Sequence, residues 1–398
     1  MDLSLCIIVK NEETTLPRCL DSVRDVVDEM VVLDTGSSDR TPEIAREFGA
    51  RVYEFEWCND FSAARNESLK YVRGKWILVL DADEELTAGI IPHIKQAIKS
   101  DSHILINLIR QEIGATQSPY SLISRLFRNH PDIRFSRPYH AMVDDSIGEI
   151  LKREPHWQIG ALPEVAILHD GYQPGAIAGK NKLQKARSAM EGFLAAHPTD
   201  PYVCSKLGAL YVETGEVQRG IALLKRGLTD VSIDRGVLYE LHYHLGIAYR
   251  HQQQVAKAKD HYQAAIQLEI LPQLKLGAYN NLGNLLQEER NWVAAKSAYE
   301  QALQIDPHFA TGHYNLGMTL KAMGNFGDAI ASYQRAVQIH PTYAEAFQNL
   351  GVVLLKVGKV PESLAAFRQA IALHELSNPG EAERLRRGLR DMGFLVEG

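Results

Sequence analysis

The first part of the chain alternates short apolar runs with segments in which apolar residues recur at helical spacing. Apolar runs bounded by charged or turn residues are typical of buried strands, and they occupy residues 3–9, 30–33, 51–55 and 76–80. Helical spacing marks residues 14–26, 41–48 and 61–72. This alternation predicts a parallel sheet that helices cover on both faces. Ligands bind beyond the carboxyl ends of such strands. We therefore expect the functional residues in the loops after Val9, Leu33 and Leu80.

The second part of the chain is built from a repeated pattern. The pair Leu-Gly recurs with its Gly at positions 208, 246, 283, 317 and 351, at spacings of 38, 37, 34 and 34 residues. In the last four units an Ala or Ser stands twelve residues after the Gly, and an aromatic residue stands four residues further on. This pattern resembles the tetratricopeptide repeat, a helix pair of about 34 residues. Each pair buries its apolar face only against its neighbours, so the resemblance implies a stacked helical array.

These two patterns divide the chain into four parts. Residues 1–172 form the sheet domain, and residues 173–200 form a linker helix with half a repeat. About five repeats occupy residues 201–377, and residues 378–398 form a charged capping helix. The expected architecture is therefore an α/β domain with a Rossmann-like sheet, followed by an all-α superhelix.

Composition and charge exclude several classes of protein. The chain is 45% hydrophobic and 23% charged, as in an ordinary soluble protein. Its formal net charge of −6 provides no basic excess for binding nucleic acid. The four cysteines are scattered without a C-x-x-C pair, which argues against a disulfide framework or a structural zinc site. No apolar run is long enough for a signal peptide or a membrane helix. We therefore expect a cytoplasmic protein without a transmembrane segment.

The most informative single motif is Asp81-Ala82-Asp83, which directly follows the apolar residues 78–80. Two carboxylates this close repel each other unless a cation neutralises them. A hard divalent ion that also bridges phosphate oxygens would do so, and it would stabilise a departing diphosphate. The alternative is a pair of solvated loop acids that cap the next helix, since this tripeptide also occurs by chance.

Three further segments precede the acid pair. They are residues 4–13 (SLCIIVKNEE), 31–41 (VVLDTGSSDRT) and 60–66 (DFSAARN). Together with the acid pair, they make residues 3–170 resemble the family 2 glycosyltransferases. The resemblance implies the GT-A fold and a nucleotide-diphosphate sugar, a UDP- or GDP-sugar, as the donor. The combination with a tetratricopeptide tail also resembles a bacterial subgroup that includes peptide S-glycosyltransferases.

The resemblance also implies roles for individual residues. Contacts to the nucleotide sugar would come from six positions: Val9, Glu12, Asp34, Arg65, Asn66 and Asp81. Asp34 would hydrogen-bond the base, and Asp81 would approach the ribose or the sugar. Asp83 would bind Mn²⁺ or Mg²⁺. His169, which follows a short apolar strand, would be a further ligand of the metal or the diphosphate.

The general base remains open at the level of sequence. In the subgroup pattern an acid follows the His at position 140, but Ala141 stands there in this chain. An inverting displacement needs a carboxylate or a His within hydrogen-bond reach of the acceptor's nucleophile. His140, Asp144 and Asp145 are the candidates. A thiol acceptor would need only a weaker base, because thiols ionise near about pH 8.5.

The expected function is metal-dependent glycosyl transfer with inversion. The repeats would bind a protein or peptide acceptor, or they would mediate self-association into a homo-oligomer, and their periodicity is the same in both cases. The alternative is a nucleotide-binding scaffold protein that has lost catalysis, which the missing acid at position 141 favours. A nucleotidyltransferase is a weaker interpretation, because residues 10–13 contain no glycine for a phosphate loop.

Overall fold

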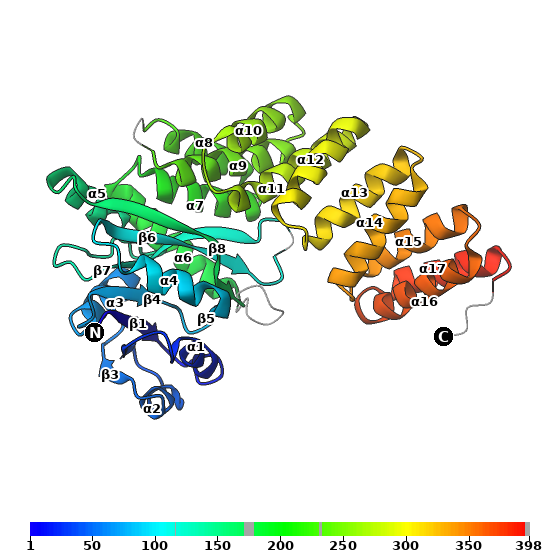
Figure 1. Cartoon of the computed structure of the whole chain (residues 1–398). Helices are drawn as coiled ribbons and strands as arrows, with labels where there is room; N and C mark the ends of the chain where they lie inside the picture. Colours follow the sequence, from blue (N-terminus) through cyan, green and yellow to red (C-terminus); the bar gives the residue numbers. More distant parts are fainter. Residues whose placement is uncertain (116, 171–178, 231–232, 395–398) are drawn as a thin grey trace. The chain divides into compact units, whose positions relative to one another are not determined.

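The computed structural model describes residues 1–115, 117–170, 179–230 and 233–394, and Figure 1 shows the order of its elements. The chain forms two compact units. The first comprises residues 1–115 and 119–236, and the second comprises residues 116–118 and 237–398. Among the helices in the described ranges, none has the length and apolar character needed to cross a membrane.

The four strands predicted from the sequence are present and parallel. They are β1 (Leu3–Val9), β2 (Glu29–Asp34), β3 (Arg51–Glu54) and β4 (Trp76–Val79), in the spatial order β3-β2-β1-β4. Residues of β1 and β4 are buried almost throughout, because both faces of this part of the sheet are covered. The strands are joined by α1 (Leu16–Val23), α2 (Thr41–Glu47) and α3 (Phe61–Leu69).

The sheet continues with four strands that make it mixed rather than wholly parallel. β7 (Tyr120–Arg128) pairs antiparallel with β4, and β6 (His103–Glu112), β8 (Gln158–His169) and the edge strand β5 (Glu84–Leu86) follow. The expectation of a parallel sheet is therefore correct only for β1 to β4. β7 and β8 are only partly buried over much of their length, so their sequences lack the continuous apolar run that marks a buried strand.

Alternate strand residues feed two apolar clusters on opposite faces of the sheet. Leu5 and Leu78 belong to the cluster that includes residues of α1, α2 and α4 (Ile91–Ala97). Cys6 and Val79 belong to the cluster that includes residues of α5 (Asp144–Arg153) and residues at the end of α3. Helices on both faces therefore hold the sheet, and its carboxyl edge carries the loops.

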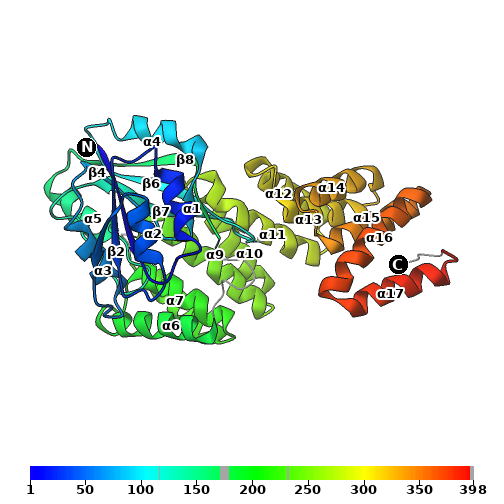
Figure 2. The same ribbon diagram turned by 90° about the horizontal axis from the view of Figure 1, so that it is seen from below.

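Three helices that follow the sheet in the chain also belong to the first compact unit. They are α6 (Gly179–Ala196), α7 (Pro201–Glu213) and α8 (Val217–Gly227). Figure 2 shows α6 and α7 side by side. Met190, Leu194 and Leu207 form an apolar cluster between these helices, and Tyr139 of the sheet domain packs against it. The first repeat pair is thus part of the same body as the sheet.

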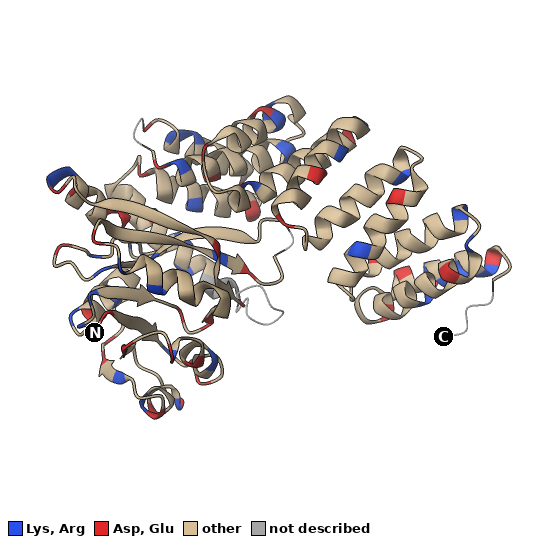
Figure 3. Ribbon diagram, in the orientation of Figure 1, with Lys and Arg blue, Asp and Glu red and all other residues tan. Residues whose placement is uncertain are grey.

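The second unit is a series of helix pairs. They are α9 (Arg235–His251) with α10 (Val255–Gln267), α11 (Leu276–Glu288) with α12 (Trp292–Ile305), α13 (Ala310–Ala322) with α14 (Phe326–Ile339), and α15 (Ala344–Lys356) with α16 (Val360–Ser377), followed by α17 (Pro379–Asp391). Figure 3 shows Lys and Arg interspersed with Asp and Glu along these helices.

The spacing between Leu-Gly and the later aromatic residue, which recurs from repeat to repeat, has a steric cause. A Cβ atom added at Gly283 would lie 2.6 Å from the ring of Tyr299, and one at Gly317 would lie 2.8 Å from the ring of Tyr333. Both tyrosine rings are fully buried. Each repeat therefore needs a residue without a side chain at this position, because the ring of the second helix lies against the backbone of the first.

Candidate active site

The predicted site residues after β1 and β2 lie side by side at the carboxyl edge of the sheet. Val9 pairs with Asp34 in the parallel register, and the carbonyl oxygen of Val9 accepts hydrogen bonds from the backbone N–H (2.9 Å) and the hydroxyl (3.0 Å) of Thr35. The carboxylate of Glu12 accepts a hydrogen bond from the hydroxyl of Thr15 at 2.6 Å. These contacts shape the two loops that the resemblance places around the nucleoside.

Asp34 is buried and organises the loop that follows it. Its carboxylate accepts hydrogen bonds from the backbone N–H groups of Gly36 (3.1 Å) and Ser37 (3.0 Å), and from the hydroxyl of Ser37 at 2.5 Å. Gly36 has a φ of 98°, a backbone conformation that glycine adopts at no steric cost. The contact of Asp34 with a nucleotide base stays a prediction.

Asp81 is bound by two arginines from different elements. Its Oδ1 accepts a hydrogen bond from Nη2 of Arg65 on α3 at 2.6 Å, and its Oδ2 accepts one from Nη2 of Arg125 on β7 at 2.9 Å. Burial alone would raise the pKa of Asp81, but the positive charges of Arg125 and Arg65 hold this pKa well below its usual range. Asp81 is therefore a carboxylate over the whole physiological pH range.

Each of these arginines retains donor capacity. Nη1 of Arg65 and Nη1 of Arg125 are buried and have no hydrogen-bond partner among the described residues. The side chains themselves are only 7% and 12% exposed. A buried N–H without a partner is rare in folded proteins and points to a missing ligand or water. The buried Glu84 also acts on both guanidinium groups, so it is the two N–H groups without a described partner that suit an anionic ligand such as a phosphate.

Asp83 and His169 lie together, as the resemblance implies. Oδ2 of Asp83 is 3.2 Å from Nε2 of His169, and Nδ1 of His169 is 2.5 Å from the carboxylate of Glu112. The pairing of β5 with β8 places Glu84 opposite His169 and so brings position 83 next to it. Burial lowers the pKa of His169, but its hydrogen bonds with Asp83 and Glu112 outweigh this and raise it to about 10.

The chemistry of Asp83 and His169 suits a divalent cation. Throughout the described ranges, no three His, Cys, Asp or Glu side chains are arranged around one point as metal ligands. Asp83 and His169 nevertheless place a carboxylate oxygen and an imidazole nitrogen within 3.2 Å of each other. Mg²⁺ is commonly held by one or two protein ligands together with substrate phosphates and water. The two residues fit such a site provided that a bound cation displaces the Nε2 proton, which the raised pKa of His169 otherwise retains, whereas Asp81 is occupied by its arginines.

Behind Asp81, Asp83 and His169 lies a second layer of charged side chains, which the sequence did not reveal. These side chains form hydrogen bonds and ion pairs with one another and with the site residues. Arg110 on β6 donates one hydrogen bond to the buried Glu84 at 2.9 Å and forms an ion pair with Glu112 at 2.7 Å. The carboxylate of Glu84 also accepts a hydrogen bond from the backbone N–H of Asp81 at 2.8 Å. Arg110 and Glu112 come from a strand that the apolar pattern did not predict, so no local signal placed them here. Arg125 lies on β7, another strand that the apolar pattern did not predict, and no local signal identified Asp81 as its partner.

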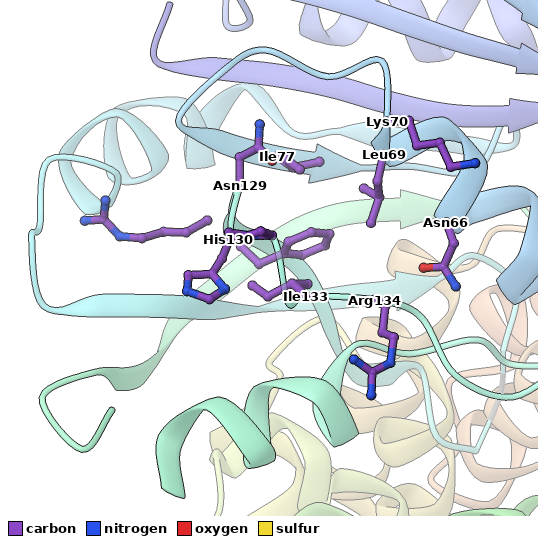
Figure 4. Close-up of a pocket in the computed structure, with 11 residues that line it drawn as sticks. Asn66, Leu69, Lys70, Ile77, Asn129, His130, Ile133 and Arg134 are labelled. Atoms are coloured by element: carbon purple, nitrogen blue, oxygen red, sulfur yellow. The ribbon is translucent and has the colours of Figure 1, made fainter. Parts of the chain in front are cut away.

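Asn66 takes a structural position next to Arg65. Its amide accepts a hydrogen bond from the backbone N–H of Phe135 at 2.7 Å and donates one to the backbone oxygen of Phe135 at 2.9 Å. It also lies at the rim of a cavity of about 430 Å³, in which Leu69, Ile77 and Ile133 point toward the middle (Figure 4). The contact of Asn66 with the nucleotide sugar stays a prediction.

The three candidates for the general base have different surroundings. Asp144 begins α5, accepts a hydrogen bond from the hydroxyl of Ser124 at 2.8 Å, and keeps its other oxygen buried without a partner among the described residues. Burial raises the pKa of Asp144. Asp145 is half exposed and is bound by both Nη atoms of Arg137, at 2.6 and 3.2 Å. His140 is exposed and has a φ of 53°.

Comparisons with known proteins agree with the two-part architecture. A sequence model of glycosyl transferase family 2 matches residues 4–160. Tetratricopeptide repeat models match segments between residues 239 and 377. Among solved structures, YrrB, described as a TPR protein with an unusual peptide-binding site, is similar with a TM-score of 0.41 and 18% identity, covering 51% of this chain and 100% of that chain.

Relatives match both parts of the chain. A TPR repeat-containing protein of Synechococcus elongatus is 45% identical over 305 residues, which is 77% of this chain and 76% of that protein. The glycosyltransferase SunS of Bacillus subtilis is 29% identical over 202 residues, and an uncharacterized glycosyltransferase of Rickettsia bellii is 29% identical over 154 residues. These matches cover 49% and 36% of this chain, and about half of each glycosyltransferase (46% and 52%). The chain therefore combines an N-terminal glycosyl transferase family 2 domain with a C-terminal array of tetratricopeptide repeats.

Proposed function

We propose that this glycosyltransferase transfers a sugar from a UDP- or GDP-sugar to a protein or peptide acceptor, with inversion at the anomeric carbon. The observation that supports the proposal most strongly is the charge cluster at the carboxyl edge of the sheet. There Asp81 lies between Arg65 and Arg125, each of which has a buried N–H without a described partner. Guanidinium N–H groups suit phosphate oxygens, and a carboxylate suits sugar hydroxyls.

In the proposed reaction the acceptor's nucleophile attacks the anomeric carbon on the face opposite the diphosphate. The bond between that carbon and the diphosphate oxygen breaks, and its electron pair leaves with the nucleoside diphosphate. The proton of the nucleophile passes to a carboxylate. Arg65 and Arg125 would donate hydrogen bonds to the negative charge that grows on the leaving group. Mn²⁺ or Mg²⁺, bound to Asp83 and His169, would neutralise part of the same charge.

Asp144 is the strongest candidate for the proton acceptor. Its carboxylate is buried, one of its oxygens has no described partner, and burial raises its pKa. A raised pKa makes a carboxylate a stronger base, which favours proton transfer from a hydroxyl or a thiol. Asp145 is less suited, because Arg137 binds both of its oxygens. We therefore assign the base to Asp144 within this proposal.

The proposal also covers the role of the repeats, which would recruit the acceptor, and the cellular compartment, which would be the cytoplasm. Tetratricopeptide arrays are protein-interaction modules, and we infer that this array recruits the acceptor, with assembly into a homo-oligomer as the other use of the same surface. All four cysteines are free thiols. This state agrees with a cytoplasmic enzyme, where thiols stay reduced.

A donor screen by mass spectrometry tests the proposal. The full chain is incubated with UDP- and GDP-sugars and Mn²⁺ or Mg²⁺, with the protein itself and added peptides as acceptors. We expect release of one nucleoside diphosphate and a matching sugar mass on an acceptor, and a loss of at least about 100-fold in rate for Asp83→Asn. Glu43→Gln, an exposed acid on α2, is the control. Full activity of Asp83→Asn, or no consumption of any donor, contradicts the proposal.

A nucleotide-binding scaffold protein is the second candidate. Ala141 occupies the position where the subgroup has an acid, and it packs against an apolar cluster of the sheet domain. The screen separates the two functions, because a scaffold would bind UDP or GDP without breaking the bond between diphosphate and sugar. Calorimetric titration with UDP and GDP measures the binding, and the mass spectra measure the transfer.

A further inference from the structure

The imidazole of His169 lies between two acids that come from opposite sides of strand β8. Nδ1 faces the carboxylate of Glu112 at 2.5 Å, and Nε2 faces the carboxylate of Asp83 at 3.2 Å. β6 and β5 flank β8 in the sheet, and His169 is in register with Glu112 on β6 and with Glu84 on β5. The pairing of three strands therefore fixes which acid meets which ring nitrogen.

The two sides of this imidazole differ in their access to solvent. The side chain of Glu112 is 10% exposed, that of His169 is 19% exposed, and that of Asp83 is 39% exposed. The exposed fraction thus rises from the Nδ1 side of the ring to the Nε2 side. A cation from solvent can therefore reach Nε2 beside Asp83, whereas Glu112 covers Nδ1.

The charge of Glu112 fixes the position of one ring proton. Glu112 forms an ion pair with Arg110, and a carboxylate accepts hydrogen bonds but donates none. The nitrogen of His169 that faces Glu112 therefore carries a hydrogen atom. A cation can take the place of the proton on Nε2, while the proton on Nδ1 stays in its hydrogen bond. In metal sites the histidine ligand commonly donates its other N–H to a carboxylate, which fixes the orientation of the ring.

Arg110 holds Glu112 in this orientation. The two residues are two apart on β6, so their side chains lie on the same face of the sheet. Arg110 pairs with Oε1 of Glu112 at 2.7 Å, and His169 faces Oε2, so each oxygen has its own partner. Arg110 also donates a hydrogen bond to Glu84, which accepts another from the backbone N–H of Asp81. One arginine thus connects the support of His169 with the turn that carries the acid pair.

We propose that Glu112 is a positioning residue of the transfer reaction, which holds the imidazole of His169 so that Nε2 and Asp83 together meet a divalent cation. Arg110 fixes Glu112 in this role. The inference rests on the proposed function, because the cation belongs to that proposal. Glu112 acts through His169 and is not a ligand itself. Loss of such a carboxylate partner typically weakens metal binding by about 10- to 100-fold.

Binding of Mn²⁺ to the full chain without a donor sugar tests this role. Mn²⁺ is titrated alone and with UDP or GDP present, and electron paramagnetic resonance measures the free ion. We expect Glu112→Gln to weaken the binding of Mn²⁺ at least about tenfold, because the amide keeps the size of the side chain but not its charge. Glu154→Gln is the matched control, since Glu154 also lies beside a histidine, His130, at 3.7 Å. The control should leave the affinity unchanged.

Nuclear magnetic resonance of the metal-free chain with ¹⁵N-labelled histidine tests the same contact without a cation. We expect a far-downfield proton on Nδ1 of His169 in the wild type, the signature of a strong hydrogen bond to a carboxylate. The signal should be absent from His169→Gln, which assigns it, and should move upfield in Glu112→Gln. Because the wild type itself carries the signal, this measurement decides the matter even if Glu112→Gln folds poorly.

Three results overturn the inference: the wild type binds no Mn²⁺, Glu112→Gln binds Mn²⁺ as tightly as the wild type, or the wild type lacks the downfield signal of His169. The donor screen judges the proposed function separately. Sugar transfer by the wild type with unchanged Mn²⁺ binding in Glu112→Gln contradicts only the role of Glu112. No consumption of any donor contradicts the transfer itself.

Discussion

Asp81 and Asp83 are two residues apart but have different surroundings. Asp81 is held by two arginines whose side chains are nearly buried, while Asp83 contacts only the imidazole of His169 among the described side chains and is 39% exposed. The charge of Asp81 is therefore needed by the fold, because without it two buried guanidinium groups would face each other. On the proposed function Asp83 serves the chemistry, and we expect its contribution to stability to be small.

This difference gives a prediction for two alanine variants. We expect Asp81→Ala to lower the free energy of unfolding by about 3 kcal/mol, because buried charges lose their partner. Asp83→Ala should change it by less than about 1 kcal/mol, since Glu112 still binds His169. Urea unfolding monitored by tryptophan fluorescence measures both values. If both variants lost the same free energy of unfolding, the different stabilising roles assigned to Asp81 and Asp83 would be wrong.

The sequence reveals the acids of the site but not the groups that hold them. Asp81, Asp83 and His169 each follow an apolar strand, and the resemblance connects them. Arg110 and Glu112 lie on β6, whose pairing with β8 crosses several register shifts. No local pattern encodes a contact between strands that are far apart in the chain. The positions of Arg110 and Glu112 next to the site can therefore be seen only in the folded sheet.

His242 in the second unit gives a prediction about pH. Burial lowers the pKa of His242, whose Nδ1 lies 2.9 Å from Nδ1 of His261 on α10. Below its ordinary pKa of about 6.5 the unfolded chain binds a proton more readily than the folded chain. This contribution to stability is therefore present above about pH 6.5 and is lost as the pH falls. Urea midpoints at pH 7.5 and 5.0 should differ less for His242→Gln than for the wild type, and an unchanged difference would contradict this account.

At the scale of elements, a contact between a glycine and an aromatic ring recurs through the array. Gly246 meets Tyr262, Gly283 meets Tyr299, and Gly317 meets Tyr333. The first repeat differs, because Gly208 meets Leu224 and Gly220 lies against the backbone of Gly208. The sequence pattern predicts this array well, since each contact lies within about 16 residues of chain. Strands β5, β6 and β7 were not predicted, and of β8 only the short apolar end before His169 was, because their partners are distant.

Adding one methyl group tests this contact. Gly283→Ala would place a Cβ atom 2.6 Å from the ring of Tyr299, and we expect a loss of about 2 kcal/mol in stability from overpacking. Gly327→Ala on α14 is a matched control, because nothing lies within 4 Å of the added atom. The control should be neutral or more stable by up to about 1 kcal/mol, as alanine favours a helix. Thermal unfolding of both variants gives the comparison.

At the scale of the whole molecule, the first repeat pair belongs to the same compact unit as the sheet domain. Arg137 joins α5 to the start of α7 through Asp145 and Asp200, and Tyr139 packs into the cluster of α6 and α7. The predicted boundary near residue 172 follows the change in sequence pattern. The compact unit of the folded chain extends to residue 236.

Two fragments test the extent of this unit. We expect residues 1–236 to unfold in one cooperative transition. Residues 1–172 should melt at a temperature lower by at least about 5 °C or aggregate, because Tyr139 and Arg137 lose their partners. Differential scanning calorimetry measures both transitions. A fragment of residues 1–172 as stable as the longer one would contradict the assignment of α6, α7 and α8 to the first unit.

The position of β8 in the sheet sets the order in which the site is completed during synthesis. β8 is the last strand to leave the ribosome, yet it lies inside the sheet, between β6 and the edge strand β5 that begins next to Asp83. A nascent chain that ends before β8 lacks His169, and β5 has no neighbour to pair with. Pairing between such distant segments is slow. Asp83 and His169 therefore come together only after the whole domain has been made, and on the proposed function a partly synthesised chain would lack this part of the site.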